Sequence, residues 1–272
     1  MKPMYRMENP SKRGVVKGIF KFNNAWKIFV KDWKEMRHNR QLFWSVLLFP
    51  LIIAIGLPLM MMGTFIADGI PATEIYEIFK VEIGSMMKLQ FMLIPVIVCA
   101  MIAGDSLAGE KERKTAETLI VLPVTAKELF IGKVLAALIP ALLYAVIGFA
   151  IMGILSNLLV LEPILAGNPP IIFADLSFWV IAFLLSPIFV LVMVQVVVAI
   201  SARLSTAKSA QQVSMIFAIP IFGVMFISFT GPGIISDVGI LLGLSAILLG
   251  IALVLANFGS RAINKERFIA TL

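Results

Sequence analysis

Residues 178–202 read FWVIAFLLSPIFVLVMVQVVVAISA and contain no Asp, Glu, Lys or Arg. A helix rises about 1.5 Å per residue, so about 20 apolar residues cross a hydrocarbon core of about 30 Å. Apolar and polar residues do not alternate in this run, as they would in the strands of a membrane β-barrel. The segment is therefore predicted to be a transmembrane helix, and it indicates an all-α membrane protein.

The composition of the whole chain supports further crossings. Hydrophobic residues make up 60% of the sequence, charged residues 14%, and the mean hydropathy is +0.99. A soluble domain carries about a quarter charged residues, so much of this apolar surface must face lipid. We expect six transmembrane helices, at about 42–64, 89–108, 134–155, 178–202, 210–229 and 238–258.

The basic residues predict the orientation of the spans. In the six-span arrangement all of the 23 lysines and arginines except Lys80 and Lys88 fall on one side. Basic loops remain in the cytoplasm, so both termini are expected there, in a multi-pass protein of the cell membrane.

The segment before the first span has its own pattern. Residues 1–22 are expected to form a cytoplasmic tail, and residues 23–272 the transmembrane domain. Apolar side chains recur at helical spacing just before residue 42, and lysines fall on the opposite side, which is typical of a helix lying in the membrane interface. The alternative is a helix packed on a soluble partner. The residues of this predicted elbow helix are Trp26, Phe29 and Trp33 on the apolar side and Lys27, Lys31 and Lys34 on the basic side.

Several kinds of chemistry have no motif in this sequence. The single histidine, His38, does not belong to a His-Glu-x-x-His zinc motif, and no Gly-x-x-x-x-Gly-Lys-Ser/Thr loop is present to bind ATP phosphates. An ion-driven carrier usually has ionisable groups deep in its spans. Here Asp105 lies near the end of the second predicted span, and Gln195 is the clearest polar residue deep in a span. If the protein drives active transport, the energy must come from another polypeptide.

The most informative stretch for function is 103–139, AGDSLAGEKERKTAETLIVLPVTAKELFIGKVLAALI. A dense charge cluster follows the second predicted span, and a short apolar piece ends at Pro123. Thr125 and Glu128 then form a Thr-x-x-Glu capping box at the start of the third-span helix. The pattern predicts a short cytoplasmic helix near 115–122, between two membrane helices.

This stretch resembles the ATP-binding-cassette type-2 permeases, which are the membrane subunits of a large exporter family. That family has a glutamate-containing charged loop, a Thr-x-Glu-x-Leu-like turn, a proline and a Gly-Lys pair at the start of the third span. The usual glycine before the threonine is replaced here by Lys114. The matching residues are Glu110, Glu112, Arg113, Thr115, Glu117, Leu119, Pro123, Glu128, Gly132 and Lys133.

The resemblance implies a coupling helix that docks on a separate nucleotide-binding subunit, which would bind ATP and Mg²⁺. This chain would bind no cofactor or nucleic acid itself, and it would pair with a second copy or a paralogue. The alternatives are a solvated loop without a partner, an ATPase-independent carrier or channel, or a membrane scaffold or assembly factor. The implied coupling residues are Glu110, Lys111, Glu112, Arg113, Lys114, Thr115, Glu117 and Thr118, and those at the entry to the third span are Thr125, Glu128, Gly132 and Lys133.

Two smaller features of the sequence allow more than one interpretation. Methionines gather near the outer ends of the first two spans, where thioethers could hold Cu(I), but adaptable packing is the favoured interpretation and no metal site is expected. Loop 161–175 contains three prolines and is interpreted as interfacial or partly re-entrant. The methionines are Met60, Met61, Met62, Met86, Met87 and Met92.

Overall fold

The computed structural model describes residues 21–78, 84–115, 124–159, 161, 164, 166–170, 175–216, 219, 223 and 237–262. Every regular element in these ranges is a helix, which confirms the all-α class. The helices are α1 (Phe22–His38), α2 (Arg40–Ala67), α3 (Ala72–Ile78), α4 (Gly84–Glu112), α6 (Ala126–Leu159), α8 (Leu176–Val180), the π-helix η3 (Ile181–Leu185), α9 (Ser186–Ser201), α10 (Ala207–Ile216) and α12 (Val238–Ala262).

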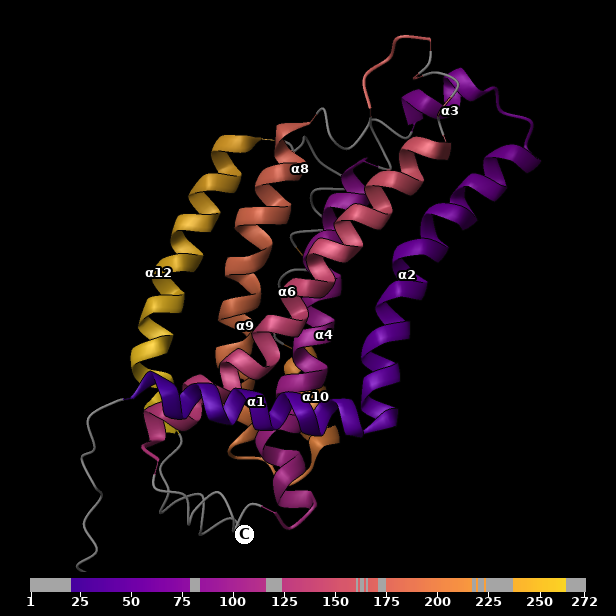
Figure 1. Ribbon diagram of the computed structural model, residues 1–272. Coiled ribbons are helices and arrows are strands. Elements are labelled where there is room, and N and C mark those ends of the chain that lie inside the picture. The colour runs from indigo at the N-terminus through magenta and orange to yellow at the C-terminus, as the bar shows by residue number, and fades with distance from the viewer. Residues whose placement is uncertain are drawn as a thin grey trace, which may run out of the picture.

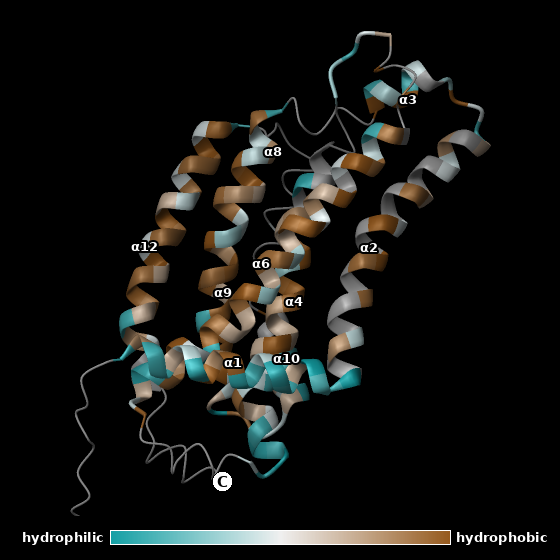
Figure 2. Ribbon diagram, in the orientation of Figure 1, coloured by the Kyte–Doolittle hydropathy of each residue, from teal (hydrophilic) through white to brown (hydrophobic). Residues whose placement is uncertain are grey.

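The long helices run side by side, and α1 lies across one end of them (Figure 1). We call this end of the bundle the α1 end and the opposite end, where α3 lies, the α3 end. Hydropathy follows this arrangement: apolar residues line the long helices, and polar residues gather on α1 and at the last turns of α4 (Figure 2). The polar belts at the two ends and the apolar middle are those of a bundle that crosses a bilayer.

Four helical segments in the described residues are long and apolar enough to span a membrane: Gln90–Glu112, Ala126–Leu158, Leu176–Ser201 and Val238–Gly259. They match the second, third, fourth and sixth predicted spans. Helix α2 covers the first predicted span. Most of the fifth, 210–229, lies outside the described residues, so the six-span count stays a prediction.

Helices α4 and α6 are among those that extend beyond the predicted spans. Helix α4 runs to Glu112, so Glu110 and Lys111 lie on its last turn instead of in a loop. Helix α6 begins at Ala126, eight residues before the predicted span at 134. Charged residues can occupy the end of a membrane helix when protein groups satisfy them, and hydropathy alone does not show this.

A π-turn interrupts the fourth span at Ile181–Leu185. The backbone N–H of Ser186 bonds to the carbonyl of Ile181, five residues earlier. Pro187 follows directly, and a proline cannot donate to the carbonyl four residues before it. The wider turn accommodates this proline without ending the helix.

The core has two parts along the bundle axis. The larger joins α1, α4, α6 and α9 and contains buried residues such as Leu107, Phe130 and Val194. The smaller lies toward the α3 end, around Phe91 and Phe178. At that end Lys88 forms an ion pair of 2.7 Å with Asp175, which ties α4 to the start of α8.

Candidate functional site

The last turn of α4 is joined to several other helices by its charged side chains. Lys111 Nζ donates to the carbonyl of Ala202, at the end of α9, over 2.7 Å. Glu112 Oε2 accepts the backbone N–H of Ala207, the first residue of α10, over 3.0 Å. Glu110, the residue before them, contacts Lys133 of α6, so three consecutive charged residues connect α4 to its neighbours. The end of α4 protrudes past α1 (Figure 1).

Arg113 folds back onto α4. Its guanidinium donates to both carboxylate oxygens of Asp105, at 3.1–3.2 Å. Burial alone would lower the pKa of Arg113, but the bonds and charge of Asp105 raise it. Asp105, which the sequence places near the end of a span with the next loop within reach, is thus paired with the residue that follows α4.

The turn that ends α4 explains the unusual residue at 114. Thr115 N–H bonds to the carbonyl of Glu110, and Lys114 N–H bonds to that of Lys111. These two bonds form a Schellman motif, whose C′ residue adopts a left-handed conformation and is usually glycine. Lys114 has φ of +57°, so a lysine occupies the strained position. The family pattern places a glycine here, and glycine adopts this left-handed conformation without steric cost.

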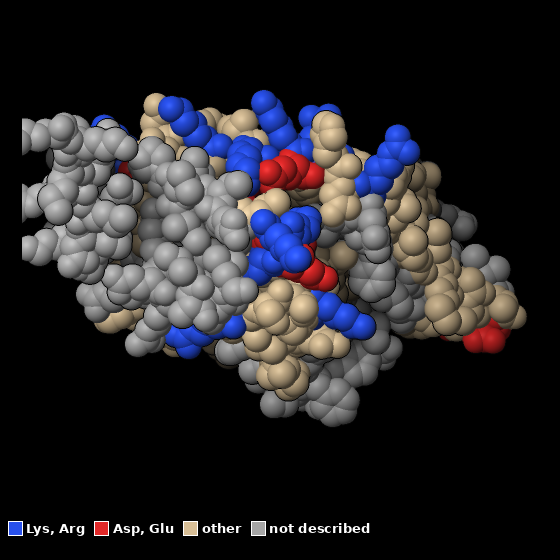
Figure 3. Space-filling view, turned by 90° about the horizontal axis from the view of Figure 1, so that it is seen from below, with Lys and Arg blue, Asp and Glu red and all other residues tan. Residues whose placement is uncertain are grey.

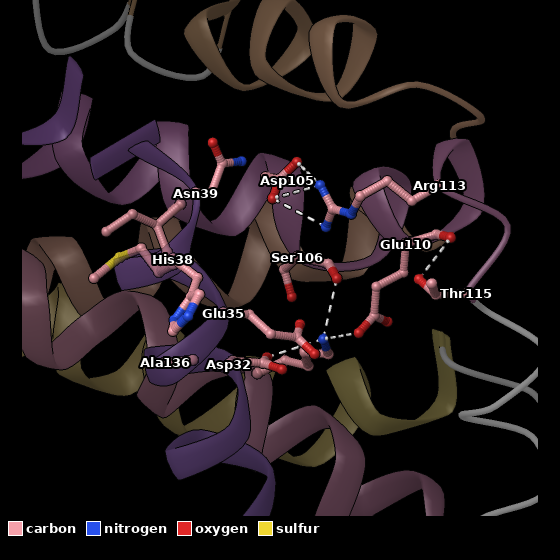
Figure 4. A pocket seen from close by; sticks show the side chains of 13 residues that line it. Asp32, Glu35, His38, Asn39, Asp105, Ser106, Glu110, Arg113, Thr115 and Ala136 are labelled. Carbon is pink, nitrogen blue, oxygen red and sulfur yellow. Dashed lines mark hydrogen bonds and ion pairs between the residues drawn. The ribbon is translucent and has the colours of Figure 1, made fainter. Parts of the chain in front are cut away.

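Lys133 is almost fully buried at the α1 end, with 1% of its side chain exposed. Its Nζ lies 2.9 Å from Glu110 Oε1 and 2.9 Å from Asp32 Oδ2, and it also donates to the carbonyl of Ser106. One ammonium therefore holds α1, α4 and α6 together. Its partners Asp32, Ser106 and Glu110 are labelled in Figure 4. We call Asp32, Glu110 and Lys133 the buried triad.

Sequence reasoning did not identify Asp32, because one acidic residue on an amphipathic helix has the pattern of a solvated group. Burial raises its pKa, and the nearby Lys133 opposes that rise. Sequence reasoning did group Glu110 with the exposed docking residues, but only 3% of its side chain is exposed. It faces the bundle, where it also contacts Lys31.

Glu128 fixes both α6 and α1. Its Oε2 accepts the N–H of Thr125, and its own N–H bonds to Thr125 Oγ1, which confirms the predicted capping box. Its Oε1 accepts the N–H of Lys21, the N-cap of α1, and a bond from Asn24. A carboxylate near a helix N-terminus is favoured by unpaired N–H groups and by the helix dipole.

Gly132 permits close contact between α6 and α1. A Cβ added at Gly132 would lie 2.7 Å from Ile28 Cβ and 2.8 Å from the carbonyl of Ala25. Glu128, Gly132 and Lys133 therefore all serve to hold α1 against the start of α6. The Gly-Lys pair thus has a packing role that spacing alone does not predict.

The apolar side of α1 is divided between the bundle and its surroundings. Phe29 is buried against the bundle, whereas Trp26 is 45% exposed and Trp33 is half-buried. Lys27 and Lys34 are exposed, but Lys31 turns toward Glu110. Lys and Arg side chains gather at several places on the described surface at the α1 end, with Asp and Glu among them (Figure 3).

Part of the predicted coupling segment lies outside the described residues. This applies to Glu117, Thr118, Leu119 and Pro123, and so to the predicted short helix near 115–122. Thr115 is the last described residue before it, and Val124 the first after it.

Comparison with known proteins identifies the family. A family model described as an ABC-2 family transporter protein matches residues 26–247. This match covers most of the chain, so the protein belongs to the ABC-2 transporter family. No curated protein sequence matches it. Family membership and the apolar helices define a multi-pass membrane protein with a transport role, and the expected family resemblance is confirmed.

Proposed function

We propose that this chain is the permease subunit of an ATP-driven exporter and that a separate nucleotide-binding subunit drives it from the α1 end. The family assignment supports the transport role. The sequence carries no loop for ATP phosphates, so the motor would be another polypeptide. Two permeases, either identical copies or this chain with a paralogue, would pair with two such ATPases.

The observation that carries the proposal is the set of attachments at the end of α4. Glu110 joins it to α1 and α6, Lys111 to α9 and Glu112 to α10. A force applied just beyond Thr115 would therefore move several helices together instead of bending one loop. Switching between inward and outward openings needs such rigid coupling between elements.

The direction of the bundle is part of the proposal. The basic α1 end would face the cytoplasm, with the ATPase, and α1 would lie in the membrane interface. The half-exposed Trp26 and the exposed Lys27 suit the boundary between acyl chains and anionic headgroups.

The experiment that tests the proposal is ATPase stimulation by reconstituted permease. The chain would first be purified to identify an ATP-binding protein that co-purifies with it. The two would then be co-expressed, and ATP hydrolysis would be measured in lipid nanodiscs. Lys114→Glu reverses an exposed charge at the end of α4 without touching the buried triad. Glu110 is unsuitable for charge reversal, because its burial would make the variant a test of folding.

We expect Lys114→Glu to insert normally and to lose most of the stimulation. Glu74→Lys, an exposed charge reversal on α3 at the opposite end, serves as the matched control and should keep it. Stimulation equal to wild type in Lys114→Glu, or no co-purifying ATPase at all, would count against the proposal. The second result would favour an ATPase-independent carrier.

A further inference from the structure

A cavity of about 340 Å³ opens at the junction of α1, α4 and α6. Asp32 and Glu35 of α1 line one side, and Glu110 of α4 lines the other (Figure 4). One carboxylate oxygen from each residue lies within 4.8 Å of the others. Three acidic groups from two helices therefore converge on one cavity, which apolar residues such as Met36 and Ile102 also line.

Two carboxylate oxygens at this junction have no hydrogen-bond partner among the described residues. Glu110 Oε2 is buried without a donor, although Glu110 Oε1 is fully engaged, and Asp32 Oδ1 is also without one. A buried anionic oxygen without a donor is costly, and native structures normally supply one or place water or an ion there. Only 3% of the Glu110 side chain is exposed, so its unpartnered Oε2 is a position where water or an ion is expected.

The charges at the cavity do not balance. Asp105 and Arg113, which also line the cavity, pair with each other, and the other three carboxylates face two ammonium groups, Lys133 and Lys31. Lys133 is buried and fixed by three contacts, but 41% of the Lys31 side chain is exposed. Lys31 is therefore the more easily displaced of the two ammonium groups.

Lys31 also marks where a cation is favoured. Its Nζ lies 3.1 Å from Glu35, 3.2 Å from Glu110 and 4.0 Å from Asp32. The ammonium thus occupies the point on which the three carboxylates converge. If a doubly charged ion replaced Lys31, its two positive charges and the one on Lys133 would balance the three carboxylates.

We propose that this cavity is a binding site for a hard divalent cation such as Mg²⁺ or Mn²⁺, with Asp32, Glu35 and Glu110 as ligands and Lys31 as an intramolecular competitor. Carboxylate oxygens are the ligands that these ions prefer. The cavity leaves room for the water molecules that Mg²⁺ retains. A bound ion would bridge α1 and the end of α4, so its binding would fix these two helices relative to each other.

The test is Mn²⁺ binding to the purified full chain in detergent. Binding is measured as the loss of the electron paramagnetic resonance signal of free Mn²⁺. We expect one Mn²⁺ per chain, displaced by Mg²⁺. Lys31→Met removes the competing charge but keeps a long side chain, and it should tighten binding at least tenfold. Lys34→Met removes an exposed charge from the same helix and should leave binding within about twofold, because screening weakens distant surface charges.

A second variant separates ligand loss from misfolding. Glu35 is exposed, so Glu35→Gln should fold normally and weaken binding at least tenfold in the Lys31→Met background. The proposal is overturned if the wild-type chain takes up no Mn²⁺, if Lys31→Met and Lys34→Met tighten binding equally, or if Glu35→Gln has no effect. Each readout is independent of ATP hydrolysis and transport, so the site can fail while the proposed function stands.

Discussion

Replacing Lys133 by methionine should strongly destabilise the α1 end of the bundle. The variant leaves two carboxylates, 3% and 13% exposed, close together with only the partly exposed Lys31 beside them. Removing one partner of a buried ion pair costs about 3–5 kcal/mol, because the remaining charge stays desolvated. For a domain of about this size that corresponds to a fall in melting temperature on the order of 10 °C.

The assay is thermal unfolding of the purified chain in detergent, with Lys127→Met as the matched control. Lys127 is an exposed lysine in the first turn of the same helix, so its loss should change little. Neutralising the two acidic partners in the Lys133→Met background, with Asp32→Asn and Glu110→Gln, should recover at least half of the lost stability. Equal melting temperatures for Lys133→Met and Lys127→Met would refute the buried triad as a stabilising contact.

Three further predictions use the same unfolding measurement. Gly132→Ala should lower the melting temperature more than Gly148→Ala, because a Cβ at 148 meets nothing within 4 Å; equal effects would contradict the close contact of α1 with α6. Lys114→Gly should stabilise the chain by about 1 kcal/mol by relieving a left-handed backbone, and Lys114→Ala should not reproduce this gain. Burial alone would raise the pKa of Asp175, but hydrogen bonds from Lys88 and a neighbouring serine lower it. The pair therefore stabilises the fold above the ordinary aspartate pKa, and this contribution is lost as the pH falls through the lowered value; Asp175→Asn should abolish that acid-dependent loss.

The elements that could be predicted from sequence are those decided by local chemistry. Long apolar runs predicted the membrane helices because the hydrocarbon core sets a minimum length. Thr125 and Glu128 predicted their own capping box, since both of its hydrogen bonds form within four consecutive residues. The turn at Lys114 could be anticipated only in part, because the replacement of glycine did not reveal whether the left-handed conformation survives.

The contacts that could not be predicted join segments far apart in the chain. Asp32 and Lys133 are 101 residues apart, and nothing local pairs them. One signal was available: Lys133 interrupts an apolar run, and a lysine in such a position needs a buried acidic partner. Which acid supplies it became clear only when α1 was placed across α6.

The different roles of Glu110 and Glu112 have the same origin. Both lie on the last turn of α4, but Glu110 belongs to the buried triad, whereas Glu112 accepts the first N–H of α10. The directions of the two side chains follow from the continuation of α4 past its apolar part to Glu112, which the apolar pattern does not predict. The charged stretch therefore contains residues that hold helices together, and docking of a partner on its exposed residues stays a proposal.

The central claim, that a separate ATPase docks at the end of α4, is tested most directly by site-specific photo-crosslinking in membranes of the native host. A photoreactive residue would replace Lys114, and a matched one would replace Asp68, an exposed residue at the α3 end. The account predicts that position 114 captures a polypeptide whose sequence contains an ATP-phosphate-binding loop and that position 68 does not. Capture of that polypeptide from 68 alone, or from neither position, would contradict it.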